Sequence, residues 1–258
     1  MIWQALKTLF TRSATPVFQD DWIAMLEENL PLYQKLPGDL RPLLHQRIAR
    51  FVASTRFEGC GGLELTEEMI ITIAAQASLL VLHRDGTPYP ELRTVYLYPT
   101  TFSSVQKRVD PIGIVTEGEV SRLGESWSSG TVVLAWDSVA HGARDLLDGQ
   151  NVTFHEFAHQ LDHEDGPTDG APPLPSRAAY RSWAKVFSEN YDDFLDQLET
   201  GKRTLLDPYG ATNPAEFFAV ATETFFEKPR QLKKKRPDLY QKLQSYYQLD
   251  PAKWFRGN

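Results

Sequence analysis

Residues 151–165 read NVTFHEFAHQLDHED, and the pattern HExxH lies within them at residues 155–159. On a helix, His155 and His159 project from one face, so their ring nitrogens can meet a single ion at the zinc–nitrogen distance of about 2.0–2.1 Å. Glu156 lies about 100° further round the helix, where it can act on water as a general base instead of binding the metal. Chance produces this pattern in a chain with so few histidines about once in a hundred cases. The stretch therefore predicts an amphipathic helix that presents a metal-binding face.

Composition places the chain among ordinary globular proteins. Of its 258 residues, 41% are hydrophobic and 24% are charged, and the formal net charge of −7 argues against general affinity for nucleic acid. Cys60 is the only cysteine, which excludes an internal disulfide and a thiolate metal site and suits the reducing cytosol. No apolar run is long enough to cross a bilayer. We therefore expect a cytoplasmic protein with no membrane segment.

The first residues, MIWQALKTLF, carry apolar side chains at helical spacing but no basic leader ahead of them. We expect this segment to dock on the body of the protein or to be disordered, and we do not expect a signal peptide. The length allows one large domain or two small ones. We expect a single domain over 1–258, with a helical N-terminal part at about 18–65 and a catalytic core at about 66–248.

Most of the chain has the periodicity and capping signals of helices. Thr66 is a good N-cap, and Glu67 and Glu68 follow it in the first turn, where the helix dipole favours carboxylates. The run that they open is apolar nearly all round, which predicts a buried central helix. The other predicted helical stretches are residues 20–54, 151–165, 177–198, 213–227 and 237–247.

Between these helices, residues 94–98, 112–116 and 131–136 are short runs rich in β-branched and aromatic side chains. Gly, Pro and Ser separate them, and we expect turns or loops at residues 58–63 and 126–130. The predicted fold class is therefore α+β, mainly helical, with a small mixed sheet ahead of the HExxH helix. An exposed edge strand of that sheet could bind an extended peptide by strand addition.

A catalytic zinc needs a third protein ligand besides the two histidines. Asp162 shares their helix face but lies one turn too far along, so it fits better as an acceptor that orients an imidazole, or as a plain surface residue. Glu216 follows the helix start Asn213-Pro214 and could be a capping residue, yet its aromatic neighbours indicate a buried carboxylate that needs a cation. Glu223, seven residues on, is a rival ligand or a second partner of the site. These residues alone leave the choice open.

Three segments together resemble one known family. They are HEFAHQLD, the SWSSGTVVLAW ahead of it, and the DPYGATNPAEFFAVATETFFEKP after it, and they are similar to the Mlc titration factor A family of bacterial zinc peptidases. The family's catalytic domain is similar to that of anthrax lethal factor, which implies a zincin-like fold. The resemblance implies one zinc per chain on His155, His159 and Glu216, with Glu156 as base. It also implies that Tyr209, in a Pro-Tyr-Gly turn, donates a hydrogen bond to the transition state.

Two main functions follow from these features. The first is a zinc-dependent peptidase with peptide substrates, and the resemblance implies that its activity is aminopeptidase-like. The second, implied by the resemblance, is a regulatory protein of glucose uptake that binds the transcriptional repressor Mlc, with peptidase activity secondary. A third reading, direct binding of nucleic acid through the basic run at residues 228–236, is weaker because the run contains no aromatic side chain for stacking on bases. We expect that run to be a solvated face.

Overall fold

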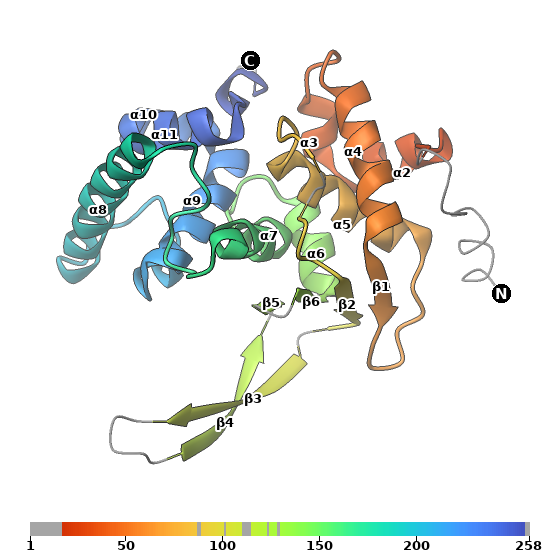
Figure 1. Cartoon of the computed structure of the whole chain (residues 1–258), viewed down its shortest axis with the longest axis horizontal. Coiled ribbons are helices and arrows are strands. Elements are labelled where there is room, and N and C mark those ends of the chain that lie inside the picture. The colour runs from red at the N-terminus through yellow and green to blue at the C-terminus, as the bar shows by residue number, and fades with distance from the viewer. Residues whose placement is uncertain are drawn as a thin grey trace.

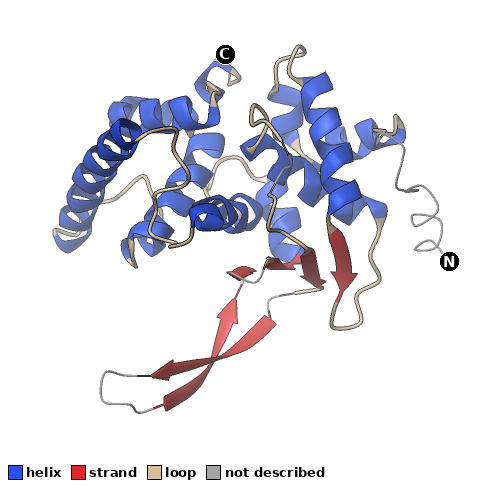
Figure 2. Ribbon diagram, viewed as in Figure 1, coloured by secondary structure: helices blue, strands red, loops and turns tan. Residues whose placement is uncertain are grey.

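A computed structural model describes residues 17–86, 89–100, 102–109, 115–122, 124–127 and 130–255. Helices make up most of these residues, and the strands gather along one side of the helical body (Figures 1 and 2). The expectation of a mainly helical α+β protein with a small sheet is confirmed. The expectation for the first residues lies outside the described part of the chain, because the description begins at residue 17.

The N-terminal helices are α2 (Asp21–Asn29), α3 (Pro31–Lys35), α4 (Arg41–Ser54) and α5 (Glu67–Leu80). Thr66 caps α5 as predicted, since its hydroxyl accepts a hydrogen bond from the Met69 amide at 3.3 Å. Nearly all of α5 is buried, and it packs against α2, α4 and α7. A helix buried on all sides has no need of a polar face, which explains its continuous apolar sequence.

The main sheet has the strand order β1-β2-β6-β5, from β1 (Arg56–Gly59), β2 (Thr94–Tyr98), β6 (Thr131–Ala135) and β5 (Gly124–Trp127). The first three strands are parallel, with Phe57 opposite Val95 and Val95 opposite Val132, and β5 joins antiparallel at the edge. The sheet is therefore mixed. Two predicted loops were partly wrong. Strand β1 takes the start of the expected turn at 58–63, and β5 takes the start of the expected loop at 126–130.

Strands β3 (Phe102–Val109) and β4 (Val115–Arg122) form a separate antiparallel hairpin that projects away from the body in Figure 1. The sequence predicted a strand at 112–116. The structure instead begins β4 at Val115, and residues 112–114 lie outside the described part. Phe102 pairs with Arg122 and Val109 with Val115, so the two strands are paired along their whole length.

The C-terminal half is helical. It comprises α6 (Trp136–Arg144), α7 (Val152–Asp162), α8 (Arg177–Glu199), α9 (Pro214–Glu227), α10 (Pro229–Lys235) and α11 (Pro237–Tyr247), with short 3₁₀ turns at η1 (His163–Asp165), η2 (Pro208–Ala211) and η3 (Pro251–Lys253). Trp136 opens α6 instead of ending a strand, and most of the basic run is the short helix α10. Both helices were missing from the sequence prediction.

Helix α7, which carries the HExxH pattern, packs against α5, α6 and α9 and lies beside β5 and β6. Its apolar side is held by aromatic contacts. Phe154 stacks on Phe226 with ring centroids 4.8 Å apart, and Phe157 meets Phe51 at 5.6 Å. Both phenylalanines of α7 are fully buried, so the opposite, polar side of the helix is fixed in direction. Within the described ranges, no helix has the length and hydropathy needed to cross a bilayer.

Candidate metal centre

Helix α7 begins with a side-chain cap. Asn151 accepts a hydrogen bond from the Phe154 amide at 3.0 Å, so the helical register is set four residues before His155. His155 and His159 then project from adjacent turns, with ring centroids 4.8 Å apart and planes at 80°. Their Nε2 atoms are 3.2 Å apart. The predicted convergence of the two imidazoles is present.

Helix α9 brings the two candidate glutamates to the same place. Pro214 occupies its first turn, and the Asn213 side chain accepts from the Glu216 amide at 3.0 Å. Two turns separate Glu216 from Glu223, so both lie on the face that meets α7. Glu216 thus has a backbone role at the helix start and also a carboxylate free to reach the histidines.

Three donor atoms converge at this helix–helix contact. Glu216 Oε2 lies 2.9 Å from His155 Nε2 and 3.2 Å from His159 Nε2. Tetrahedral ligands at the usual zinc distances of about 2.0–2.1 Å lie about 3.3 Å from one another. The separations of 2.9, 3.2 and 3.2 Å therefore fit the edges of one zinc tetrahedron, and two imidazoles with one carboxylate are a common donor set of catalytic zinc. The residues fit the ion.

Glu223 lies on the other side of the His155 ring. Its Oε1 is 2.8 Å from His155 Nδ1, and its Oε2 accepts a hydrogen bond from the Asn151 amide. Burial disfavours a charged imidazole, but the hydrogen bonds to Glu216 and Glu223 outweigh it and hold the pKa of His155 well above its ordinary value. The two glutamates thus occupy different sides of one ring, and only Glu216 faces both histidines.

Charge in the centre is concentrated and shielded from water. Glu156 is buried at 5% exposure, and its negative charge contributes to the raised pKa of His155. Burial acts to raise the pKa of Glu216, but hydrogen bonds from His155 and His159 prevail and hold it far below its usual range. A partly buried carboxylate kept ionised in this way is suited to a cation.

Tyr209 lies in η2, at the edge of the centre. Its ring centroid is 5.8 Å from that of His155, and 55% of the residue is exposed. Asp207 caps the turn by accepting from the Tyr209 amide at 2.8 Å, and its other oxygen accepts from the Gln150 side chain at 2.7 Å. A hydrogen bond therefore links this turn to Gln150, the residue before the N-cap of α7.

Asp162 has a partner different from the expected one. Its carboxylate accepts from the Gly170 amide at 3.1 and 2.8 Å, and among the described residues His159 Nδ1 has no hydrogen-bond partner. Burial raises the pKa of Asp162 to about 6, although the Gly170 hydrogen bond opposes the shift. Asp162 therefore fastens the end of α7 to the following loop instead of contacting an imidazole.

Sequence reasoning missed Asn151, Gln76 and the Gln150–Asp207 pair. Asn151 was quoted as the first residue of the deciding stretch, and its position ahead of the helix was a signal of its capping role. Nothing in the sequence indicated that Gln76, in an apolar run, forms a hydrogen bond with Asn151 at 2.8 Å. Such long-range pairs become visible only when α5 and α7 are packed together.

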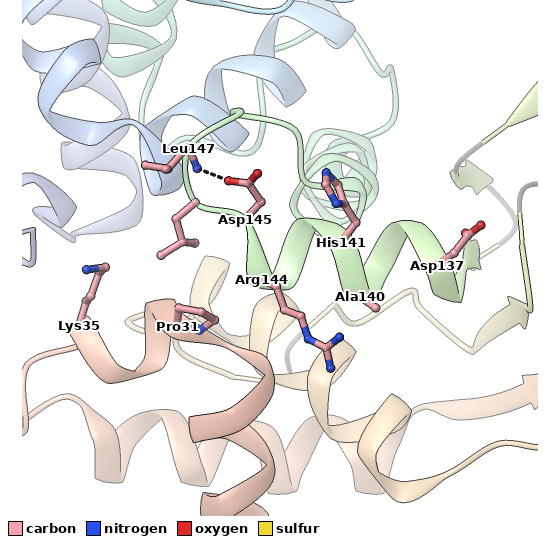
Figure 3. A pocket seen from close by; sticks show the side chains of 9 residues that line it. Pro31, Lys35, Asp137, Ala140, His141, Arg144, Asp145 and Leu147 are labelled. Atoms are coloured by element: carbon pink, nitrogen blue, oxygen red, sulfur yellow. Dashed lines mark hydrogen bonds between the residues drawn. The ribbon is translucent and has the colours of Figure 1, made fainter.

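Another group of possible metal ligands lies outside this centre. His141, Asp145 and Asp148 bring ligand atoms together near the end of α6, and a cavity of about 660 Å³ opens beside them between α3 and α6 (Figure 3). His141 is exposed and pairs with Asp148 at 3.0 Å. Each aspartate also accepts from a backbone amide of its own loop, as Asp145 does from Leu147 in Figure 3. These hydrogen bonds explain why the three side chains lie together, because they hold the loop after α6 closed. The residues that line the cavity include none of those in the metal centre.

Known proteins resemble nearly the whole chain. The family model for glucose-regulated metallo-peptidases, M90, matches residues 3–248. An uncharacterised protein of Synechocystis is 44% identical over 247 residues, covering 95% of this chain and 88% of the relative. Two chains named Mlc titration factor A are also similar. The Klebsiella pneumoniae protein is 33% identical over 89% of this chain and 86% of its own, and the Serratia proteamaculans protein is 35% identical over 74% and 72%.

Proposed function

Because the chain belongs to the glucose-regulated metallopeptidase family M90, we propose that it is a zinc-dependent peptidase whose ion is held by His155, His159 and Glu216. The observation that carries the proposal is the convergence of three donor atoms at separations of 2.9, 3.2 and 3.2 Å, which suit one tetrahedral ion. Glu223 is then a partner of His155 and not a ligand, because its carboxylate faces the opposite ring nitrogen.

Held by His155, His159 and Glu216, zinc would supply Lewis-acid chemistry toward water and a peptide carbonyl. Glu156 accepts the proton of the attacking water and delivers it to the leaving amine. The phenol of Tyr209 donates a hydrogen bond to the oxyanion that develops on the carbonyl. Glu223 holds the Nδ1–H of His155, so that Nε2 remains the metal-binding nitrogen.

The proposal extends to the fold and the substrate. Three features support a zincin-like single domain over the chain: one continuous hydrophobic core, a mixed sheet and an adjacent HExxH helix. The exposed position of Tyr209 leaves room for a peptide beside the histidines. We propose an aminopeptidase-like preference within the cytosol, the compartment that the single cysteine suits.

The test combines metal analysis with turnover. Purified protein should contain one zinc per chain, and His155→Ala should abolish stoichiometric zinc. Glu156→Gln keeps size and shape but cannot accept the proton, so zinc should remain while peptide hydrolysis falls by about 10²–10⁴-fold. Near wild-type hydrolysis by this variant would exclude Glu156 as the base. Full zinc in Glu216→Ala together with loss of zinc in Glu223→Ala would show that the other glutamate is the ligand.

A second function is favoured by the relatives named Mlc titration factor A, two of which are 33% and 35% identical to this chain. We propose that this chain also binds a repressor of the Mlc type. Binding and catalysis are separable in Glu156→Gln, which should bind the purified repressor as wild type does while its peptide hydrolysis is reduced as described above. Absence of binding by the wild-type protein in a pull-down with Mlc would remove this second function and leave the peptidase proposal intact.

A further inference from the structure

Asn151 is buried at 2% exposure, and each of its polar side-chain atoms has a hydrogen-bond partner. Its oxygen accepts from the Phe154 amide, and its Nδ2 donates to Gln76 Oε1 at 2.8 Å and to the Gly142 carbonyl at 2.9 Å. Its backbone N–H donates to Glu223 Oε2. A single residue therefore joins α7 to α5, α6 and α9.

Capping alone does not explain this arrangement. A cap needs one acceptor, which Ser, Thr or Asp supplies as well as Asn does. The two donated bonds contribute nothing to capping, and they fix the start of α7 against two other helices. The packing is also close, because a Cβ on Gly142 would lie 3.0 Å from the Asn151 Cα. Of the capping residues, only asparagine combines the acceptor with two side-chain donors.

The constraint reaches the metal centre through Glu223. One oxygen of this carboxylate binds the Asn151 amide, and the other lies 2.8 Å from His155 Nδ1. His155 itself follows one turn later, with its amide donating to the Asn151 carbonyl at 2.9 Å. A shift of Asn151 would move the helix turn and the carboxylate together, and the imidazole would turn with them.

We propose that Asn151 is a positioning residue for metal binding: its side-chain Nδ2, tied to Gln76 and Gly142, fixes the residue, and its backbone N–H then sets the Glu223 carboxylate and through it the orientation of the His155 ring. The inference rests on the proposed zinc centre for its functional meaning. Partners that hold a metal-binding histidine from its far nitrogen change metal affinity by about 10–100-fold when they are lost. Asn151 acts one step further out and should have an effect near the lower end of that range.

Asn151→Ser tests the proposal because serine keeps the cap and removes both donors. The zinc dissociation constant, measured by competition with a chelator, should rise about 10-fold. Ser176→Asn is the matched control. Ser176 caps α8 by accepting from the Ala179 amide at 3.1 Å and forms no hydrogen bond with the centre's residues in the described structure, so its variant should bind zinc as wild type does. A wild-type dissociation constant in folded Asn151→Ser would reduce Asn151 to a cap and overturn the proposal.

A second readout needs no metal. In protein stripped of zinc, the His155 Nδ1 proton held against Glu223 should exchange slowly with water by NMR, and Asn151→Ser should accelerate that exchange. If Asn151→Ser does not fold, Gln76→Met decides, since it keeps the cap and the Gly142 bond but breaks the tie to α5. Unchanged exchange in the deciding variant overturns the positioning role. Failure of the wild-type protein to bind zinc would instead overturn the proposed function, and the exchange rates would still settle the role of Asn151.

Discussion

At the scale of single residues, the centre shows how one imidazole can have two carboxylate partners with different tasks. Glu216 and Glu223 have similar sequence contexts, and both flank His155. Residue spacing alone left them as rivals, because a separation of seven places both on one helix face. What distinguishes them is the direction of the ring between them, and that direction depends on how α7 packs against α9.

Tyr209→Phe tests the least constrained member of the centre. The substitution removes only the phenol hydroxyl, which is proposed to donate a hydrogen bond to the oxyanion and so to act more strongly in the transition state than in the ground state. We expect kcat to fall by about 10²-fold, as for the loss of one oxyanion donor. KM, zinc content and melting temperature should stay near wild type, because the residue is 55% exposed and phenylalanine keeps the ring. Lower stability with unchanged kcat would make Tyr209 a structural turn residue.

Asp162→Asn tests the buried carboxylate at the end of α7. The raised pKa of about 6, against 3.8 for an ordinary Asp, means that the folded protein binds the proton more tightly than the unfolded chain. Wild-type stability from this group is therefore complete below about pH 4 and is lost as pH rises through about 6. In metal-free protein, Asp162→Asn should match wild type near pH 4 and be more stable at pH 8, by at most about 3 kcal/mol. Urea unfolding at the two pH values measures this, and a difference independent of pH would contradict it.

At the scale of elements, the loop after α7 is fitted closely to the start of α9. Gly170 has φ +85°, and a Cβ there would lie 2.5 Å from the Pro214 carbonyl oxygen. Its amide binds Asp162, and its carbonyl accepts from the Trp183 indole at 2.8 Å. The loop therefore links the end of α7 to the beginning of α9, the two helices that carry the proposed metal ligands.

Gly170→Ala should disturb that link. Backbone strain and the contact with Pro214 together should lower the free energy of unfolding by about 2–4 kcal/mol, and zinc affinity should fall because Glu216 follows Pro214 by two residues. Gly86→Ala is the control, since Gly86 has a matching φ of +84° but nothing within 4 Å of an added Cβ. The difference between the two variants in urea unfolding isolates the Pro214 contact. Equal effects would show that strain alone matters.

Elements with strong local signals were predicted well from sequence. Caps and proline starts located α5, α9 and α11, and β-branched runs located β2 and all of β6, with one residue too many at the end of β6. Strands β1 and β5 were missed. One reason is that Gly59 and Ser126 are turn-forming residues, which pair only when neighbouring strands are present. Helix α6 was missed because Trp136 also suits a strand, and its helical state depends on packing. For β1, β5 and α6, tertiary contacts outweigh the local conformational preference of the residues, so the sequence alone did not predict them.

At the scale of the whole molecule, the proposed ion joins α7 to α9 and should stabilise the fold by mass action. At free zinc about a thousand times the dissociation constant, the gain is about 4 kcal/mol, so chelation should lower the melting temperature by about 10 °C. Hydrogen exchange should increase first at the start of α9 and along α7, and least in the buried α5. His155→Ala serves as the control, since its melting temperature should not respond to the chelator. An equal response in both proteins would contradict the prediction.

The proposed ligands lie on two helices, α7 and α9, that are synthesised at different times. His159 and Glu216 are 57 residues apart, and α8 and η2 lie between them. During translation the ribosome releases both histidines well before the glutamate, so a nascent chain carries Glu156 without a complete ligand set. A zinc-dependent hydrolytic activity assembled in this order cannot begin until α9 has emerged and folded against α7. With the proposed ligand set, the centre is therefore complete only after α8 and α9 have been made and α9 has folded against α7.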